Sequence, residues 1–181
     1  MHIGVIPDGN RRYMEKKGVK SLFSSYDMGI TQFHDFLTWC QSRGVDEVTI
    51  YALSLENIVN RDSLEIKTLL SVFNDNAVKS LEDKRIHENE IMIRICGDKA
   101  ALTAIKGVGG LGDQLIENLS RLEEATKDYN RLKLNLAIGY GGRQEIVAAA
   151  RKTVDAGKPV TAENIEENLW VSSHPDLIIR T

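Results

Sequence analysis

Apolar residues follow two patterns that alternate along the chain: short continuous runs, and longer stretches in which they recur every three or four residues. The short runs are rich in β-branched residues and are typical of buried strands. They cover residues 3–6, 48–53, 91–96, 132–138 and 177–179. The longer stretches keep apolar side chains on one face and predict helices. They cover residues 28–43, 62–84, 115–127 and 143–156, and shorter helices fit residues 11–17 and 162–169.

This alternation favours a particular fold class. Strands that are apolar throughout are typical of a parallel sheet with helices on both faces. We therefore expect an α/β fold with a mostly parallel, six-stranded sheet, and a chain of 181 residues suits a single domain. Ligands of such sheets bind beyond the carboxyl ends of the strands. Candidate chemistry is therefore sought at four strand exits, residues 8–13, 54–61, 139–143 and Arg180.

Composition narrows the class of protein. Hydrophobic residues make up 42% of the chain and charged residues 27%, which fits a soluble globular protein. The net charge of −3 argues against a nucleic-acid-binding protein. Cys40 and Cys96 lie in apolar patterns, so we interpret both as buried thiols rather than a disulfide framework. The sequence has no apolar run long enough to span a membrane and no export signal, so we expect a cytoplasmic protein.

The first strand exit, residues 8–12 (DGNRR), combines an acidic residue with features of an anion site. Gly9 lets the backbone approach a ligand closely, and the helix N-terminus behind it attracts anions. Arg12 adds a forked, permanently charged donor. Asp8 would repel a phosphate unless a divalent cation bridged its carboxylate to a diphosphate. An ordinary Asp-Gly turn that caps a helix explains the same residues equally well.

The residues around this exit are basic. Positive side chains in the first twenty residues outnumber the acidic ones, Asp8 and Glu15, by three, which suits a small anionic ligand. A solvated helix face would show the same excess of charge. The positive side chains are Arg11, Arg12, Lys16, Lys17 and Lys20.

The second strand exit, residues 54–61, places a hydroxyl, an amide and a guanidinium within eight residues. Ser54 and Asn57 are three residues apart and share a face if the segment is helical. Together with Arg61 they could orient a polar substrate, although Ser54 could instead simply cap a helix.

The remaining exits have simpler interpretations. Residues 140–143 fit a tight turn from a strand into a helix, and Asp176 and Arg180 could form a surface ion pair. The four histidines show neither metal-ligand spacing nor a partner nucleophile, which argues against a zinc site and a Ser-His-Asp hydrolase. The glycine motifs of dinucleotide-binding and P-loop proteins are absent as well.

Four segments together resemble the signature motifs of the cis-prenyltransferases, the undecaprenyl diphosphate synthase family. They are residues 2–13 (HIGVIPDGNRRY), 51–57 (YALSLEN), 134–147 (LNLAIGYGGRQEIV) and 175–181 (PDLIIRT). The first two look most like the archaeal branch of the family. The resemblance extends over residues 2–181, in the family's order.

The resemblance implies the fold of undecaprenyl diphosphate synthase and an enzyme that condenses isopentenyl diphosphate onto an allylic diphosphate primer, farnesyl or geranylgeranyl diphosphate. Each round would add a cis double bond, and the long-chain polycis-polyprenyl diphosphate would be a precursor of a glycosyl carrier lipid. The resemblance also implies Mg²⁺, a homodimer, an apolar tunnel and transient contact with a membrane surface during product release. The alternatives are a non-catalytic subunit or polyprenyl-phosphate-binding protein of the same fold, and an unrelated sugar- or nucleotide-phosphate enzyme.

The resemblance also assigns roles to individual residues. Asp8 would hold Mg²⁺ on the diphosphate and assist its departure. Asn57 would help to remove a proton from the isopentenyl unit, and because an amide is a poor base, it would position that proton for the departing pyrophosphate. The implied substrate-binding residues are Gly9, Asn10, Arg11, Arg12 and Tyr13 for the allylic diphosphate, Ser54, Leu55, Glu56 and Ile58 for the reacting ends, and Arg61, Arg180 and Tyr26 for phosphate.

The chain departs from the family pattern in four places. Ile58 stands where the family usually has Trp or Phe, Arg61 comes one residue late, and Tyr26 stands in for a histidine. The family also continues after its Arg-Thr pair with an Arg-x-Ser segment and an acidic metal ligand. We therefore expect that residues 1–181 form one cis-prenyltransferase domain without its C-terminal segment.

Overall fold

The computed structural model describes residues 1–18 and 21–181, without the side chains of Asn10 and Arg11, and Lys20 lies outside the described residues. In the described part, five strands form one sheet with the order β3-β4-β2-β1-β5, and every pairing is parallel. The strands are β1 (His2–Ile6), β2 (Glu47–Ser54), β3 (Ile91–Cys96), β4 (Leu132–Tyr140) and β5 (Leu177–Arg180).

The prediction of a mostly parallel sheet is confirmed, but the prediction of six strands was wrong. The five apolar runs of the sequence supply the five strands of the described residues. No further continuous apolar run remains between residues 141 and 176, where the chain forms helices and an extended connection.

The helices predicted over residues 11–17 and 143–156 lie within one residue of their observed bounds, whereas the helix predicted over residues 28–43 begins six residues earlier and a short helix over residues 99–103 was not predicted. The described helices are α1 (Asn10–Lys17), α2 (Leu22–Ser42), α3 (Leu55–Asn60), α4 (Ser63–Ser80), α5 (Lys84–Glu88), α6 (Lys99–Thr103), α7 (Leu111–Thr126), α8 (Gly142–Asp155) and α9 (Ala162–Glu166). The long helix predicted over residues 62–84 ends at Ser80. Asp83 then starts a new helix, because its side chain accepts a hydrogen bond from the Arg85 N–H.

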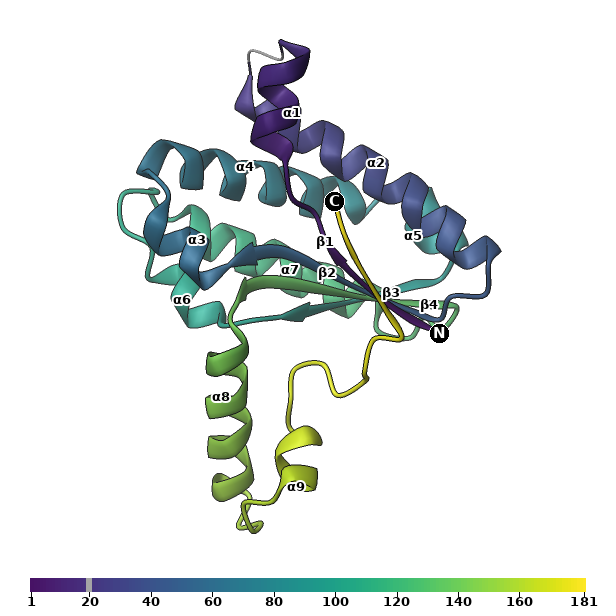
Figure 1. Cartoon of the computed structure of the whole chain (residues 1–181), viewed down its shortest axis with the longest axis vertical. Coiled ribbons are helices and arrows are strands. Elements are labelled where there is room, and N and C mark those ends of the chain that lie inside the picture. Colours follow the sequence, from purple (N-terminus) through teal and green to yellow (C-terminus); the bar gives the residue numbers. More distant parts are fainter. Residues whose placement is uncertain (19–20) are drawn as a thin grey trace.

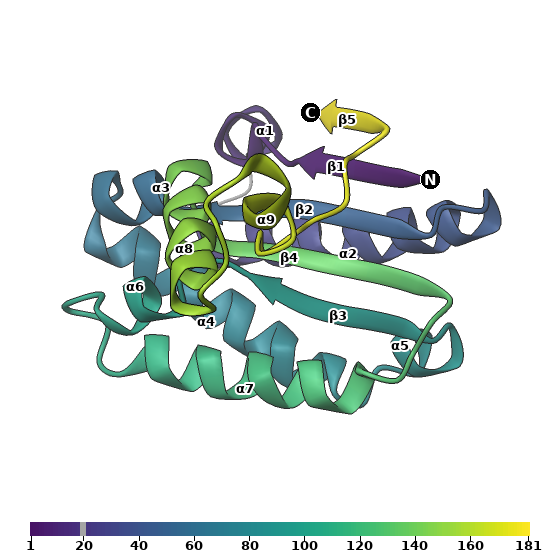
Figure 2. The same cartoon turned by 90° about the horizontal axis from the view of Figure 1, so that it is seen from below.

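The helices cover the two faces of the sheet unequally. Figure 1 shows α2 and α4 on one side of the sheet, and α8 and α9 on the other. Helix α7 packs against α4 and β3. Figure 2, seen from below, shows α8 and α9 in front of the strands and α2 and α4 behind them. The apolar core therefore lies mainly between the sheet and the layer formed by α2, α4 and α7.

Two apolar clusters make up this core. One joins β1 and β2 to α2, and the other joins the carboxyl ends of β2 and β4 to α4 and α7. Cys40 and Cys96 are buried free thiols, as predicted, and burial raises the pKa of each thiol to about 11. None of the helices in residues 1–18 and 21–181 combines the length and the apolar character that crossing a membrane requires.

The extended chain before β5 is anchored to the amino end of the sheet. The N–H of His2 donates to Asp176 Oδ2 over 2.7 Å, and the N–H of Asp176 donates to the carbonyl of His2 over 2.8 Å. The Ser173 hydroxyl donates to Glu47 Oε1 over 2.7 Å. These bonds set the register of β5 against β1, and that register decides where Arg180 lies.

Candidate active site

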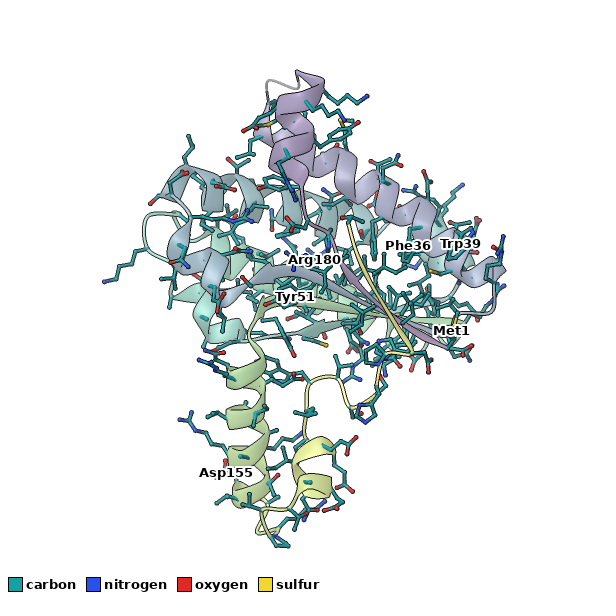
Figure 3. The ribbon with its side chains drawn as sticks, in the orientation of Figure 1. Met1, Phe36, Trp39, Tyr51, Asp155 and Arg180 are labelled. Carbon is teal, nitrogen blue, oxygen red and sulfur yellow. The ribbon has the colours of Figure 1, made fainter. Side chains whose placement is uncertain are left out.

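Three adjacent strands bring the candidate residues to one edge of the sheet. In the parallel register Val5 pairs with Ile50, so the carboxyl ends of β1 and β2 face the same edge of the sheet. On the other side of β1, Ile6 pairs with Arg180. Figure 3 shows Arg180 at the end of β5, next to β1. Asp8 and Arg180, which are far apart in the sequence, therefore meet where β1 and β5 end.

Asp8 is held by basic groups on two sides. Its Oδ2 accepts a hydrogen bond from Arg180 Nη2 over 2.8 Å, and Arg12 Nη2 lies 3.9 Å from its Oδ1. The hydrogen bonds from Arg180 and from the Gly9 N–H lower the pKa of Asp8 below its ordinary value of 3.8. Asp8 is therefore a carboxylate at neutral pH. The expected ion pair between Asp176 and Arg180 was wrong. Arg180 pairs with Asp8, and the Asp176 carboxylate accepts a hydrogen bond from the His2 N–H.

Thr181 holds the backbone that carries Asp8. Its hydroxyl accepts a hydrogen bond from the Asp8 N–H and donates one to the Asp8 carbonyl, each over 3.1 Å. Its own N–H donates to the carbonyl of Ile6. The end of β5 thus fixes both the main chain and the side chain of Asp8.

Helix α1 begins without a side-chain cap. Gly9 is the N-cap in a left-handed conformation, with φ of 92°, a region that suits glycine. Because Gly9 has no side chain that could cap the helix, it leaves the first N–H groups of α1 available to an anion. The arrangement differs from an ordinary turn in which the aspartate caps the helix, since Asp8 accepts the N–H of Gly9 instead. Arg12 and Tyr13 are exposed beside these N–H groups.

The second strand exit starts α3. The Ser54 hydroxyl is buried and accepts the Asn57 N–H over 2.9 Å, so the capping interpretation is correct for Ser54. This bond also fixes the main chain that carries the Asn57 side chain. Ile58 packs against the second apolar cluster, whereas Glu56 is exposed. The polar residue Asn57 and the apolar residue Ile58 are therefore neighbours at the start of α3, where β2 ends.

Arg61 and Tyr26 are brought together by a residue that the sequence analysis missed. Arg61 Nη1 donates to the Tyr26 hydroxyl and to Glu65 Oε1, each over 2.9 Å. The Tyr26 hydroxyl donates to Glu65 Oε1 over 3.0 Å. Because Tyr26 gives its one proton to Glu65, it does not donate to a phosphate in this arrangement. The only signal for Glu65 in the sequence is its place four residues after Arg61.

The third strand exit lies next to the second, because Tyr140 pairs with Ser54 in the sheet. Tyr140 packs edge-on against Tyr51 and Trp170, and its hydroxyl donates to the buried carboxylate of Glu145. Arg143 instead lines a separate open cavity of about 630 Å³ between α8 and the end of β3. The interpretation of residues 140–143 as a tight turn into a helix fits this geometry.

The carboxylate of Asp8 is suited to a magnesium ion that is also bound by substrate phosphates. The described residues contain no group of three or more Asp, Glu, His or Cys side chains that could hold an ion by themselves. Mg²⁺ is usually held by one or two carboxylates together with substrate phosphates and water. The partly exposed carboxylate of Asp8, beside N–H groups suited to a phosphate, fits that requirement.

Comparison with known proteins decides the family. The family model for undecaprenyl diphosphate synthase matches residues 6–181. The chain belongs to the undecaprenyl diphosphate synthase family. It is therefore a cis-prenyltransferase, and the resemblance of its four motifs to this family is confirmed.

Individual relatives agree with this assignment. The tritrans,polycis-undecaprenyl-diphosphate synthase (geranylgeranyl-diphosphate specific) of Pyrobaculum aerophilum is 34% identical over 189 residues, which cover 99% of this chain and 74% of that protein. This likeness supports the archaeal-like branch of the family.

Two solved structures share the fold. A probable undecaprenyl diphosphate synthase from Campylobacter jejuni is 26% identical, with a TM-score of 0.78, over 99% of this chain and 73% of that one. Lavandulyl diphosphate synthase from Lavandula x intermedia, in complex with dimethylallyl diphosphate, is 25% identical, with a TM-score of 0.84, over 99% of this chain and 76% of that one. The sheet and helices of this cis-prenyltransferase are thus those of its family.

Proposed function

We propose that this cis-prenyltransferase extends geranylgeranyl diphosphate with isopentenyl diphosphate and makes a long-chain polycis-polyprenyl diphosphate, a precursor of a glycosyl carrier lipid. One observation carries the proposal: the ionised Asp8 lies beside uncapped N–H groups and two arginines where β1 and β5 end. The name of the Pyrobaculum relative, which specifies geranylgeranyl diphosphate, supports the choice of primer.

The allylic diphosphate is assigned to the start of α1. The N–H groups of residues 10–12 and the side chain of Arg12 supply donors there, and Gly9 leaves room for a close approach. The side chains of Asn10 and Arg11 are assigned to the same diphosphate from the family motif alone. Tyr13 is exposed one residue further along the helix.

The reaction creates negative charge on the departing diphosphate as the allylic carbon ionises. Fixed N–H groups and guanidinium groups stabilise that charge without covalent catalysis. Asp8 would hold Mg²⁺ against the diphosphate, and the bound ion would supply further charge stabilisation to the leaving group. Arg180 would bind the diphosphate of isopentenyl diphosphate, since it lies beside Asp8 at the end of β5.

The reacting carbon atoms are assigned to the end of β2. The backbone of Asn57 is fixed by Ser54, so its amide would orient the isopentenyl unit as a proton is lost to the departing pyrophosphate. Leu55, Ile58 and the second apolar cluster would keep water away from the developing carbocation. Arg61 is assigned to the allylic diphosphate as well.

We further propose that the enzyme is a homodimer that pairs through α8. This helix projects away from the sheet, and its last residue, Asp155, lies far from the strands (Figure 3). Val147 and Val154 are exposed at a helical spacing, with Ala150 between them, and Ile146 is exposed next to them. A two-fold axis would bury the same stripe of both copies. Val154→Glu should then shift the mass measured by sedimentation from two chains to one without unfolding α8.

The activity is tested by incubating the protein with labelled isopentenyl diphosphate and Mg²⁺, with either geranylgeranyl or farnesyl diphosphate as primer. Chain-extended product, formed faster from geranylgeranyl diphosphate, would support the proposal. Binding of the primer without extension would support the non-catalytic alternative instead. Function in the cytoplasm, with contact with a membrane during product release, stays a prediction.

A further inference from the structure

We infer that Tyr26 and Glu65 are positioning residues that aim the guanidinium of Arg61 at the allylic diphosphate. The inference rests on the proposed function, in which Arg61 binds that diphosphate. It assigns roles to two residues that do not themselves touch the substrate.

The three residues come from three different elements. Tyr26 lies on α2, Arg61 follows the last residue of α3, and Glu65 lies in the first turn of α4. The Glu65 main chain is itself held, because its N–H donates to Asp62 Oδ1 over 2.9 Å. The Glu65 side chain is only 3% exposed, whereas that of Arg61 is 26% exposed. The carboxylate that holds Arg61 is therefore buried, whereas the guanidinium of Arg61 is partly exposed to solvent.

The hydrogen bonds leave a defined part of the guanidinium unused. Nη1 donates to the Tyr26 hydroxyl and to Glu65 Oε1. Nε and Nη2 have no partner among residues 1–18 and 21–181 of the described structure. A guanidinium has five N–H groups in one plane, and Nε and Nη2 together form one edge of that plane. This edge is a fork that matches two phosphate oxygens.

Tyr26 and Glu65 both accept a hydrogen bond from Arg61 Nη1, but they contribute differently. Arg61 places a positive charge beside the buried carboxylate of Glu65, which lowers the cost of burying that carboxylate. The hydroxyl of Tyr26 joins the two and carries no charge. Without it, the long side chain of Arg61 would lose one of the two bonds that fix its rotation. Because Tyr26 belongs to α2, it also ties the position of the guanidinium to the helix across from α4.

The choice of variant follows from the charges. Removing the Glu65 carboxylate would lower its repulsion of a diphosphate and at the same time release Arg61, so the two effects would oppose each other. Tyr26→Phe removes a hydroxyl and changes no charge, so only the positioning is lost. Tyr129→Phe is the matched control, because it removes a tyrosine hydroxyl that bonds to His87 Nδ1 near the amino ends of the strands.

Binding of inorganic pyrophosphate and of geranylgeranyl diphosphate would be measured by titration calorimetry. We expect Tyr26→Phe to weaken both about fivefold, which is less than the direct loss of a hydrogen bond to a charged group would cost, because Tyr26 acts on the diphosphate only through Arg61. Its effect should vanish in an Arg61→Ala background, because there is no guanidinium left to position. The KM for geranylgeranyl diphosphate should rise while the KM for isopentenyl diphosphate stays constant. Tyr129→Phe should change neither affinity.

A second variant tests the fork itself. Arg61→Lys keeps the positive charge and loses the paired N–H groups, so we expect about tenfold weaker binding of pyrophosphate. Wild-type affinity in Arg61→Lys, or a Tyr26→Phe effect that persists in the Arg61→Ala background, would overturn the inference while leaving the proposed function standing. A wild-type protein that neither binds pyrophosphate nor extends a primer would overturn both.

Discussion

Arg180 donates a hydrogen bond to the carboxylate of Asp8 over 2.8 Å, although 172 positions separate the two residues in the chain. The pair joins the residue proposed to hold Mg²⁺ to the residue proposed to bind isopentenyl diphosphate. In the structure without substrates, each group neutralises the other. Substrate diphosphates and the cation would therefore exchange partners with an existing ion pair rather than enter a site of uncompensated charge.

Replacing Asp8 with alanine should lower turnover much more than it lowers affinity. Negative charge on the leaving group develops in the transition state, so the loss of the Asp8 carboxylate should cost roughly a hundredfold in kcat. The dissociation constant for geranylgeranyl diphosphate should change only modestly. Steady-state kinetics and calorimetry would measure the two effects.

Asp46→Asn is a matched control for this variant, because Asp46 is an exposed carboxylate that pairs with the N-terminal amine. It should leave kcat unchanged. Wild-type turnover in Asp8→Ala would remove Asp8 from the mechanism.

Arg180→Ala should raise the pKa of Asp8 toward 3.8, because the hydrogen bond from Arg180 is the main cause of the lowered value. Because the pKa of Asp8 is lower in the folded protein than in the unfolded chain, ionisation of Asp8 favours the folded state. The contribution of the pair to stability is present above pH 3.8 and is lost as the pH falls through the lower pKa of the folded state. Titration of the Asp8 carboxyl signal by NMR in both proteins would show the change. An identical pKa in wild type and variant would contradict the assignment of this cause.

Ser54→Ala should weaken the start of α3 and disturb Asn57. Loss of the cap should cost about 1 kcal/mol in the free energy of unfolding, measured with urea. It should also lower kcat, since the same bond fixes the Asn57 main chain.

Thr161→Ala removes the corresponding cap of α9, away from the strand exits, and serves as the control. A similar loss of stability without a loss of kcat is expected there. Equal effects of the two variants on kcat would show that Ser54 acts through stability alone.

Gly97→Ala should be strongly destabilising. A Cβ at this position would lie 1.9 Å from the carbonyl oxygen of Ile138, and φ is +155°. The main chains at the ends of β3 and β4 would have to separate, so we expect a loss of roughly 3 kcal/mol or more in the free energy of unfolding.

Gly44→Ala provides the comparison for Gly97, since it has φ of +71° and no atom within 4 Å of its Cβ. There only the left-handed backbone conformation opposes alanine, at about 1 kcal/mol. Urea denaturation of both variants would measure the difference. Equal losses would show that the close approach to Ile138 is relieved at little cost.

Much of the fold and of the candidate site could be predicted from local sequence. Continuous apolar runs such as Val48 to Leu53 predicted strands, because burial on both faces removes the alternation of an exposed strand. The turn residues after β1 predicted an anion site at the start of a helix, because Gly9 and the unsatisfied N–H groups are properties of neighbouring residues. Ser54 predicted a helix cap for the same reason.

What the sequence by itself determined is therefore the set of elements, the motifs and the strand exits that carry polar groups. Only the tertiary structure decided which of these groups meet. Arg180 pairs with Asp8 rather than with nearby Asp176, and Glu65 captures the hydroxyl that Tyr26 would otherwise offer to a phosphate. These contacts depend on strand order, register and helix packing. Side chains from distant parts of the chain fix them together, and no local pattern of residues encodes the distance between them.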